Sequence, residues 1–221
     1  MISNPYIRVA KAGAENPKWI KATFPARGSW RSVCYGNGKF VAVDEWYSKV
    51  AYSADGITWS QATLPSSLSW SSVCYGNGKF VAVARNNSNV AMYSTNGVSW
   101  TKTQLPAYKN WHSVCYGNGK FVAVAANGDV AYSADGITWS QATLPSSLSW
   151  HSVCYGNGKF VAVASPGTAA IYSLDGIEWY QSTMPSSANW YAVCFGDGKF
   201  IATTQGSTSA YLKDYFDRWT A

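Results

Sequence analysis

The chain repeats a segment of about forty residues five times, which strongly limits the folds that it can adopt. Each copy opens with Trp and continues into a variant of SVCYGNGKFVAV. The opening residues lie 40, 41, 39 and 40 positions apart, at Trp30, Trp70, Trp111, Trp150 and Trp190. Because insertions are nearly absent, the copies should hold equivalent places in one array. Residues 50–84 and 130–164 differ only where Ser71 is replaced by His151, so the few variable positions are the informative ones.

Each copy contains two hairpin signals. SVCYG and KFVAVA flank an Asn-Gly turn in most copies, and YSA and TWSQATLP flank Asp-Gly or a variant of it. Four short strands per forty residues, without a helical period, predict one propeller blade. We therefore expect an all-β fold: a single five-bladed β-propeller of four-stranded antiparallel blades, forming one domain over residues 1–221. The predicted repeats are about 30–69, 70–110, 111–149, 150–189 and 190–221.

Both termini are predicted to belong to the array. The segment WIKATFP at 19–25 mirrors WSQATLP, so residues of about 17–24 should complete the last blade and close the ring by pairing with the C-terminal segment. Closure would remove exposed sheet edges. A partial sixth blade stays open as an alternative, because residues 211–219 also mirror YSADGITW in a degenerate form.

Composition excludes several classes of protein. With 47% apolar and 13% charged residues, the chain is not disordered. No apolar stretch approaches the roughly 20 residues of a membrane helix, and MISNPYIRVAKAG lacks the apolar region of a secretory signal. We therefore expect no membrane insertion, and a protein that stays in the cytoplasm or leaves it by a non-classical route.

Five cysteines occupy one repeat position: Cys34, Cys74, Cys115, Cys154 and Cys194. Equivalent positions in an array should lie too far apart for disulfides, and no CxxC pair suggests zinc. We expect free, buried thiols, no metal and no cofactor.

The segment SADGITW at 53–59 and its counterparts at 94–100, 133–139 and 173–179 resemble the Asp-box of BNR and sialidase-like propellers, Ser-x-Asp-x-Gly-x-Thr-Trp, with one residue fewer between Asp and Gly. The wider repeat, over roughly 30–210, is similar to Asp-box-like propeller proteins of bacteria and bacteriophage tails. This resemblance implies a propeller, a structural turn at each box between the third and fourth strands, and a virion as the location of the protein.

Catalytic residues are not evident. A sialidase would need clustered arginines for the substrate carboxylate and an activated Tyr with a Glu partner, but the five arginines occupy non-equivalent positions. Asp55, Asp135 and Asp175 precede Gly in turns, where Asp favours the backbone geometry. His112 and His151 lack carboxylates nearby in sequence, so they are predicted to be exposed and not to bind metal. We expect no enzyme activity and no catalytic residue.

Five lysines follow the first turn of each copy and should form a ring on one face: Lys39, Lys79, Lys120, Lys159 and Lys199. The Asp turns project from the same face, which makes it mixed in charge. Without a recognition motif, we expect no nucleic-acid partner.

Sequence diversity concentrates on the opposite face, where the loops between second and third strands and the blade crossovers emerge. Eleven of the 12 tryptophans fit the repeat and should pack between blades, whereas Trp46 lies in a variable loop beside Tyr47. Such an aromatic pair suits sugar stacking or protein docking. Drift of unconstrained loops is the competing explanation. The candidate ligand-binding residues are Trp46, Tyr47, Arg85, Tyr108, Lys109, Arg31, His112, His151 and Tyr191.

The favoured function is a non-enzymatic binding propeller of a bacteriophage tail or virion, made in the host cytoplasm, that recognises a host-surface glycan or receptor. The alternative is a structural assembly module that binds other virion proteins or further copies of itself. A free lectin or a glycosidase is less favoured. Nearly identical blades are compatible with several weak sites acting together.

Overall fold

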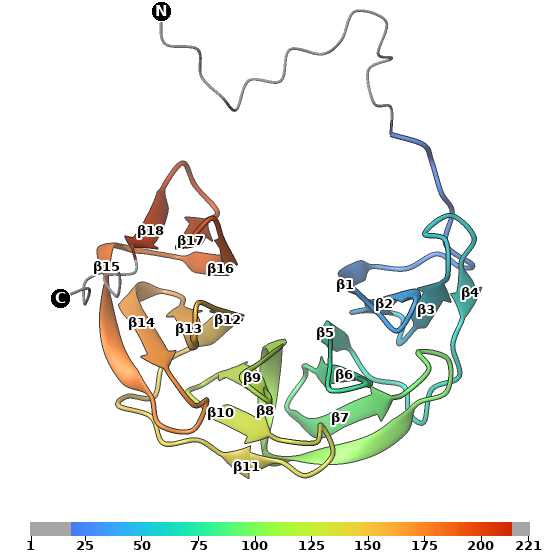
Figure 1. The fold of residues 1–221 in the computed structure, drawn as a ribbon, viewed down its shortest axis with the longest axis horizontal. Helices are drawn as coiled ribbons and strands as arrows, with labels where there is room; N and C mark the ends of the chain where they lie inside the picture. The colour runs from blue at the N-terminus through green and yellow to red at the C-terminus, as the bar shows by residue number, and fades with distance from the viewer. Residues whose placement is uncertain (1–18, 214–221) are drawn as a thin grey trace, which may run out of the picture.

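The computed structural model describes residues 19–213, which form antiparallel sheets arranged as an arc around a central opening (Figure 1). Blade 1 contains β1 (Trp30–Gly36), β2 (Lys39–Asp44), β3 (Val50–Ser53) and β4 (Ser60–Gln61). Blade 2 contains β5 (Trp70–Gly76), β6 (Lys79–Ala84), β7 (Ser88–Ser94) and the first half of β8 (Thr101–Gly117). Blade 3 contains the second half of β8 with β9 (Lys120–Ala126), β10 (Val130–Ser133) and β11 (Ser140–Gln141).

Blades 4 and 5 complete the arc. Blade 4 contains β12 (Trp150–Gly156), β13 (Lys159–Ala164), β14 (Gly167–Ser173) and β15 (Tyr180–Ala188). Blade 5 contains β16 (Trp190–Gly196), β17 (Lys199–Thr204) and β18 (Ser209–Lys213). The predicted all-β propeller is thus confirmed, with the first strand of each blade lining the opening (Figure 1). No helix in the described range could cross a membrane.

The first hairpin of each blade is tight because its turn demands left-handed backbone. Asn77 and Gly78 have φ of 44° and 73°, as a two-residue turn with both central residues at positive φ requires. The turn sets the register, so Gly76 pairs with Lys79 and Trp70 with Ala84. A bulge after Trp70 lies where the strand begins at the variable face.

The Asp turns are structural, as predicted. The carboxylate of Asp55 accepts hydrogen bonds from the backbone N–H groups of Ile57 and Thr58, both at 2.8 Å, and from the hydroxyl of Ser53 at 2.9 Å. The bonds from the Thr58 and Ile57 backbone and from Ser53 lower the pKa of Asp55 to about 2. Asp135 makes the same three bonds, so these carboxylates hold turns together.

Neighbouring blades pack by a repeated contact between large and small residues. Trp70, Trp111, Trp150 and Trp190 are fully buried, which confirms their predicted packing role. The ring of Tyr116 lies so close to Gly76 that a Cβ there would be 2.0 Å from the ring. Gly36, Gly117 and Gly156 meet the next blade's aromatic ring in the same way. A hydrogen bond also joins neighbouring blades: the backbone N–H of Val114 donates to the hydroxyl oxygen of Ser72 in the preceding blade at 3.1 Å.

The predicted ring closure is not made among residues 19–213. In this described range β18 pairs only with β17, and the arc is open between blades 5 and 1 (Figure 1). Two residues of the predicted closing strand instead contact blade 1: Thr23 bridges Thr58, and Phe24 stacks on Trp30 at 4.2 Å. Trp19 is fully exposed, contrary to its predicted packing role. Residues 17, 18 and 214–221, which the closure prediction also uses, lie outside the described residues.

A physical reason for the open arc lies in two substitutions in blade 5. Four blades contribute a serine acceptor to the next blade, and Asn37, Asn77 and Asn118 donate to a turn carbonyl in the next blade. Blade 5 has Ala192 and Asp197 at these positions. Alanine lacks the hydroxyl and aspartate lacks an N–H donor, so neither bond could be repeated onto blade 1.

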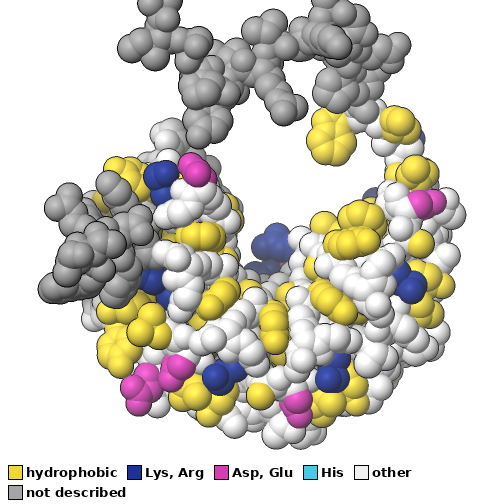
Figure 2. Space-filling model, in the orientation of Figure 1, with side chains coloured by type: hydrophobic (Ala, Val, Ile, Leu, Met, Phe, Trp, Pro, Cys, Tyr) yellow, Lys and Arg dark blue, Asp and Glu magenta, His cyan; other side chains and the backbone are white. Residues whose placement is uncertain are grey.

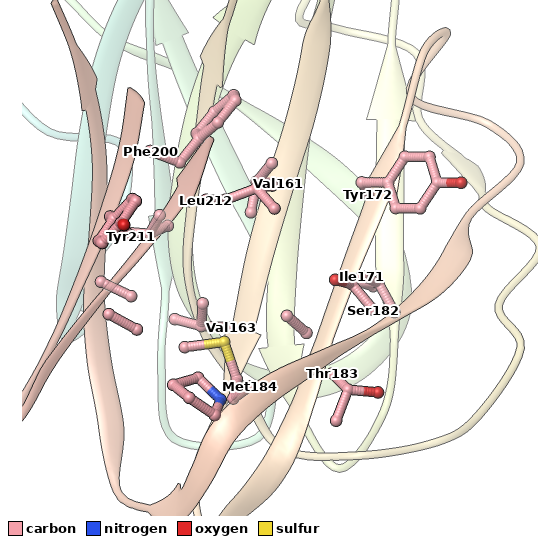
Figure 3. Close-up of a pocket in the computed structure, with 15 residues that line it drawn as sticks. Val161, Val163, Ile171, Tyr172, Ser182, Thr183, Met184, Phe200, Tyr211 and Leu212 are labelled. Carbon is pink, nitrogen blue, oxygen red and sulfur yellow. The ribbon is translucent and has the colours of Figure 1, made fainter. Parts of the chain in front are cut away.

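An apolar cavity of about 60 Å³ lies between blades 4 and 5, where residues 19–213 supply no fourth strand to blade 5 (Figure 3). Val161, Val163 and Phe200 line it. The corresponding residues between blades 2 and 3 belong to one core cluster with Trp139, the residue before β11. The cavity therefore corresponds to an internal packing position that the described part of blade 5 leaves unfilled.

Two further predictions are corrected or refined. The five cysteines are free, as expected, but four are only half-buried and Cys194 is exposed, because the inner strands border the central opening. Burial raises the pKa of the Cys34 thiol to about 12, which disfavours its reactive thiolate. Figure 2 shows basic and acidic side chains spread around one face of the arc without a patch of one sign, in agreement with the mixed charge that was expected.

Candidate functional site

The inner strands bring five of the predicted residues into one cluster. The residue that follows each opening Trp is the second residue of an inner strand. It lies beside the loop that follows the second strand of its blade, because the opening Trp pairs with the last residue of that second strand. Glu45 and Arg85 are equivalent loop residues: the N–H of each donates to the carbonyl before the opening Trp. We call the resulting group the inner-wall cluster. Its members are Arg31, Glu45, Arg85, His112, His151 and Tyr191.

Arg31 and Arg85 converge on Glu45, although they occupy non-equivalent positions in the repeat. Nη1 of Arg85 forms a short ion pair with Oε1 of Glu45, and Nε of Arg31 lies 3.8 Å from Oε2. The Glu45 side chain is only 9% exposed, whereas that of Arg31 is 53% exposed. The non-equivalent repeat positions of the two arginines did not indicate this proximity, which arises because the fold places the Arg85 loop of blade 2 beside the Glu45 loop of blade 1.

The two histidines touch, which corrects the prediction that each is exposed. Nη2 of Arg85 lies 3.2 Å from Nε2 of His112, and Nδ1 of His112 lies 3.3 Å from Nδ1 of His151. Arginine can only donate, so Nε2 of His112 accepts and its Nδ1–H donates to His151. Neutral His151 then carries its proton on Nε2. Its ring meets Tyr191 edge to face at 5.0 Å.

Desolvation is the main reason that both histidines are neutral. Burial, with the positive charge of Arg85 and smaller effects of His151 and Arg31, lowers the pKa of His112 to about 3. Burial, Arg85 and Arg31 also lower the pKa of His151. The cluster therefore takes its charge at pH 7 from Arg31, Arg85 and Glu45 alone.

We expect stability to fall as the pH is lowered from 7 to 5. The folded pKa of His112 is below its ordinary 6.5, so in this range the unfolded chain binds a proton that the folded chain excludes. The stability is complete above about pH 6.5 and decreases by at most about 1.4 kcal/mol per pH unit per histidine. Urea unfolding at pH 7 and pH 5 measures this. The double variant His112→Asn, His151→Asn should show a flatter profile; an equally steep profile would contradict the assignment.

An aromatic shelf, Trp46 and Tyr47, lies next to Glu45 in the same loop. The Trp46 side chain is 72% exposed and that of Tyr47 is 51% exposed. Asp44 is fully buried, and its carboxylate accepts short hydrogen bonds from the backbone N–H groups of Tyr47 and Ser29. The backbone N–H of Asp44 donates to the carbonyl of Lys49, which closes the loop. Because the carboxylate of Asp44 satisfies these donors, the shelf is presented by an ordered loop.

Tyr108 and Lys109 lie where β8 crosses from blade 2 to blade 3. Tyr108 is 65% exposed, but Lys109 forms an ion pair with Asp129 at 3.1 Å and donates to the Asn127 carbonyl. The charge of Lys109 is therefore already compensated.

Glu45 and Asp44 are the residues that sequence reasoning missed. The signal for Glu45 was the opposite charge of Arg85 forty positions later, at the equivalent repeat position. No group of three or more side chains suited to metal binding occurs within residues 19–213.

Comparison with known proteins gives one family. Residues 71–188, which are 118 of the 221 residues, match the DUF6242 beta propeller domain. The chain belongs to this family. The match supports the predicted propeller and does not extend to Asp-box proteins or to bacteriophage tails. No curated protein matches the sequence.

Solved structures share the fold at low sequence identity. YCF48 from Cyanidioschyzon merolae has a TM-score of 0.66 and 16% identity, over 86% of this chain and 68% of that one. A catalytically inactive virginiamycin B lyase from Staphylococcus aureus with quinupristin has a TM-score of 0.72 and 13% identity, over 87% and 73%. The designed protein Ika8 has a TM-score of 0.59 and 9% identity, over 85% and 72%. At such identities the likeness concerns the fold alone.

Proposed function

We propose that this DUF6242-family chain is a non-enzymatic binding propeller that recognises a glycan or receptor on a host cell surface, as a component of a bacteriophage tail or virion. The observation that carries the binding proposal is the junction of two surfaces at Glu45: the aromatic shelf on one side and the inner-wall cluster on the other. Exposed aromatic faces beside fixed polar groups suit sugar rings or a protein loop. Similar folds hold other ligands, since one structure is of YCF48 bound to D1 peptide.

The aromatic shelf offers a direct test. Replacing both Trp46 and Tyr47 by Ala should weaken binding to a glycan array or to host cells by about tenfold or more, because aromatic anchors dominate interface energies. The matched control is Tyr180→Ala, since Tyr180 is 49% exposed beside the Asp175 turn of the opposite face. Binding that persists unchanged in the double variant would remove the shelf from the proposed site.

A structural assembly role is the second candidate, and exposed apolar side chains at the open end of blade 1 favour it. Val33 and Tyr35 are each 60% exposed, whereas the equivalent Val73 is buried against a neighbouring blade. Unpaired apolar surface of this kind suits contact with another subunit, including a second copy. If the chain acts in assembly, Val33→Ser with Tyr35→Ser should shift light scattering towards monomer and leave glycan binding intact. An unchanged mass would count against this role.

A further inference from the structure

The polar contacts within the inner-wall cluster engage the Glu45 carboxylate and one accepting ring nitrogen on each histidine. Glu45 is paired with Arg85 and approached by Arg31, and Nε2 of His112 accepts from Arg85. Nδ1 of His151 accepts from His112. Donor capacity remains at the guanidinium of Arg31 and, when His112 donates to Nδ1 of His151, at Nε2–H of His151.

The cluster also carries an excess positive charge. Arg31 and Arg85 contribute two positive charges, Glu45 contributes one negative charge, and neutral histidines contribute none. Arg31 bears the excess on a side chain that is 53% exposed, and Nε is the atom that approaches Glu45. The other guanidinium nitrogens form a planar fork whose spacing matches the two oxygens of a carboxylate.

We propose that the inner-wall cluster binds a carboxylate of the ligand, with the Arg31 fork as the main donor and His151 as the second. This inference rests on the proposed function, because it names the chemistry that the same face would recognise: an acidic glycan, and not a neutral one. The aromatic shelf would stack on the sugar ring, while the Arg31 guanidinium would pair with the carboxylate of that sugar. A neutral ligand would leave the excess charge unpaired and these donors without a charged acceptor.

Acetate, the carboxylate alone, is the first probe. Titration into the whole protein at pH 7, followed by NMR of the arginine and histidine side chains, should give saturable shifts at Arg31 and His151. Arg31→Gln should weaken acetate binding roughly tenfold, the effect of losing one charge-assisted contact. Arg31→Lys should recover only part of the loss, because lysine keeps the charge without the fork. Lys39→Gln, the same charge change at the first-hairpin turn of blade 1, is the control and should bind acetate as the original chain does.

An oligogalacturonate and its methyl ester separate this inference from the proposed function. Preference for the acid that disappears in Arg31→Gln supports the inference. Equal binding of acid and ester, or acetate binding that is unchanged in Arg31→Gln, would overturn the carboxylate site while leaving a glycan-binding function intact. Saturable acetate binding without any attachment to glycans or host cells would support the carboxylate site and overturn the proposed glycan-binding function. Binding of sulfate but not acetate would also overturn it.

Discussion

Gly76→Ala should destabilise the protein by about 3 kcal/mol, a large effect for one added methyl group. The new Cβ would lie 2.0 Å from Cγ of Tyr116 and 2.4 Å from Cδ1, and this ring belongs to the neighbouring blade. The ring cannot retreat without breaking the packing of blade 3 on blade 2, since protein interiors are as dense as organic crystals. Urea unfolding at pH 7 measures the loss.

Gly196→Ala is the matched control because it makes the same change at the equivalent position of blade 5. No atom of residues 19–213 lies within 4 Å of the Cβ that would be added there, so the free energy of unfolding should change by no more than about 0.5 kcal/mol. The comparison also tests the open arc. If blade 5 closed onto blade 1 in solution, Tyr35 would cover Gly196 as Tyr116 covers Gly76. The two variants would then be equally destabilised, which would contradict the arrangement described above.

Trp111→Ala should cost about 3 to 5 kcal/mol of unfolding free energy. Trp111 is fully buried in the core between blades 2 and 3, and its indole N–H donates to the Ala107 carbonyl at 3.3 Å. Truncation would leave a large cavity and an unpaired carbonyl. Urea or thermal unfolding checks the prediction.

Trp46→Ala is the control for Trp111→Ala, since it removes the same side chain from an exposed loop. Its stability should match that of the original chain within about 0.5 kcal/mol. A similar loss in both variants would mean that Trp46 packs in the folded protein, and the aromatic shelf would no longer be a surface for a ligand.

Local signals were sufficient to predict the blades. An Asn-Gly turn accepts few backbone geometries, so Asn77 and Gly78 determine both the hairpin and its register. The Asp turns are equally local, because Asp55 bonds to residues two and three positions away.

The candidate site was only partly predictable. Trp46 stood out because it breaks the repeat. Its exposure could be inferred without knowing any tertiary contact. The contact of Glu45 with Arg85 and that of His112 with His151 join residues 40 and 39 positions apart. Their meeting depends on how blades are rotated against one another, and no local pattern encodes that rotation.

The sequence by itself determined the strands, the turns and the packing partners within the array, because these depend on short-range backbone geometry repeated at a constant spacing. Tertiary structure alone decided two matters. Among residues 19–213 it left the arc open after blade 5, where Ala192 and Asp197 lack the groups that join the other blades. It also gathered Arg31, Arg85 and the two histidines around Glu45, because curvature of the array directs equivalent positions towards one central opening.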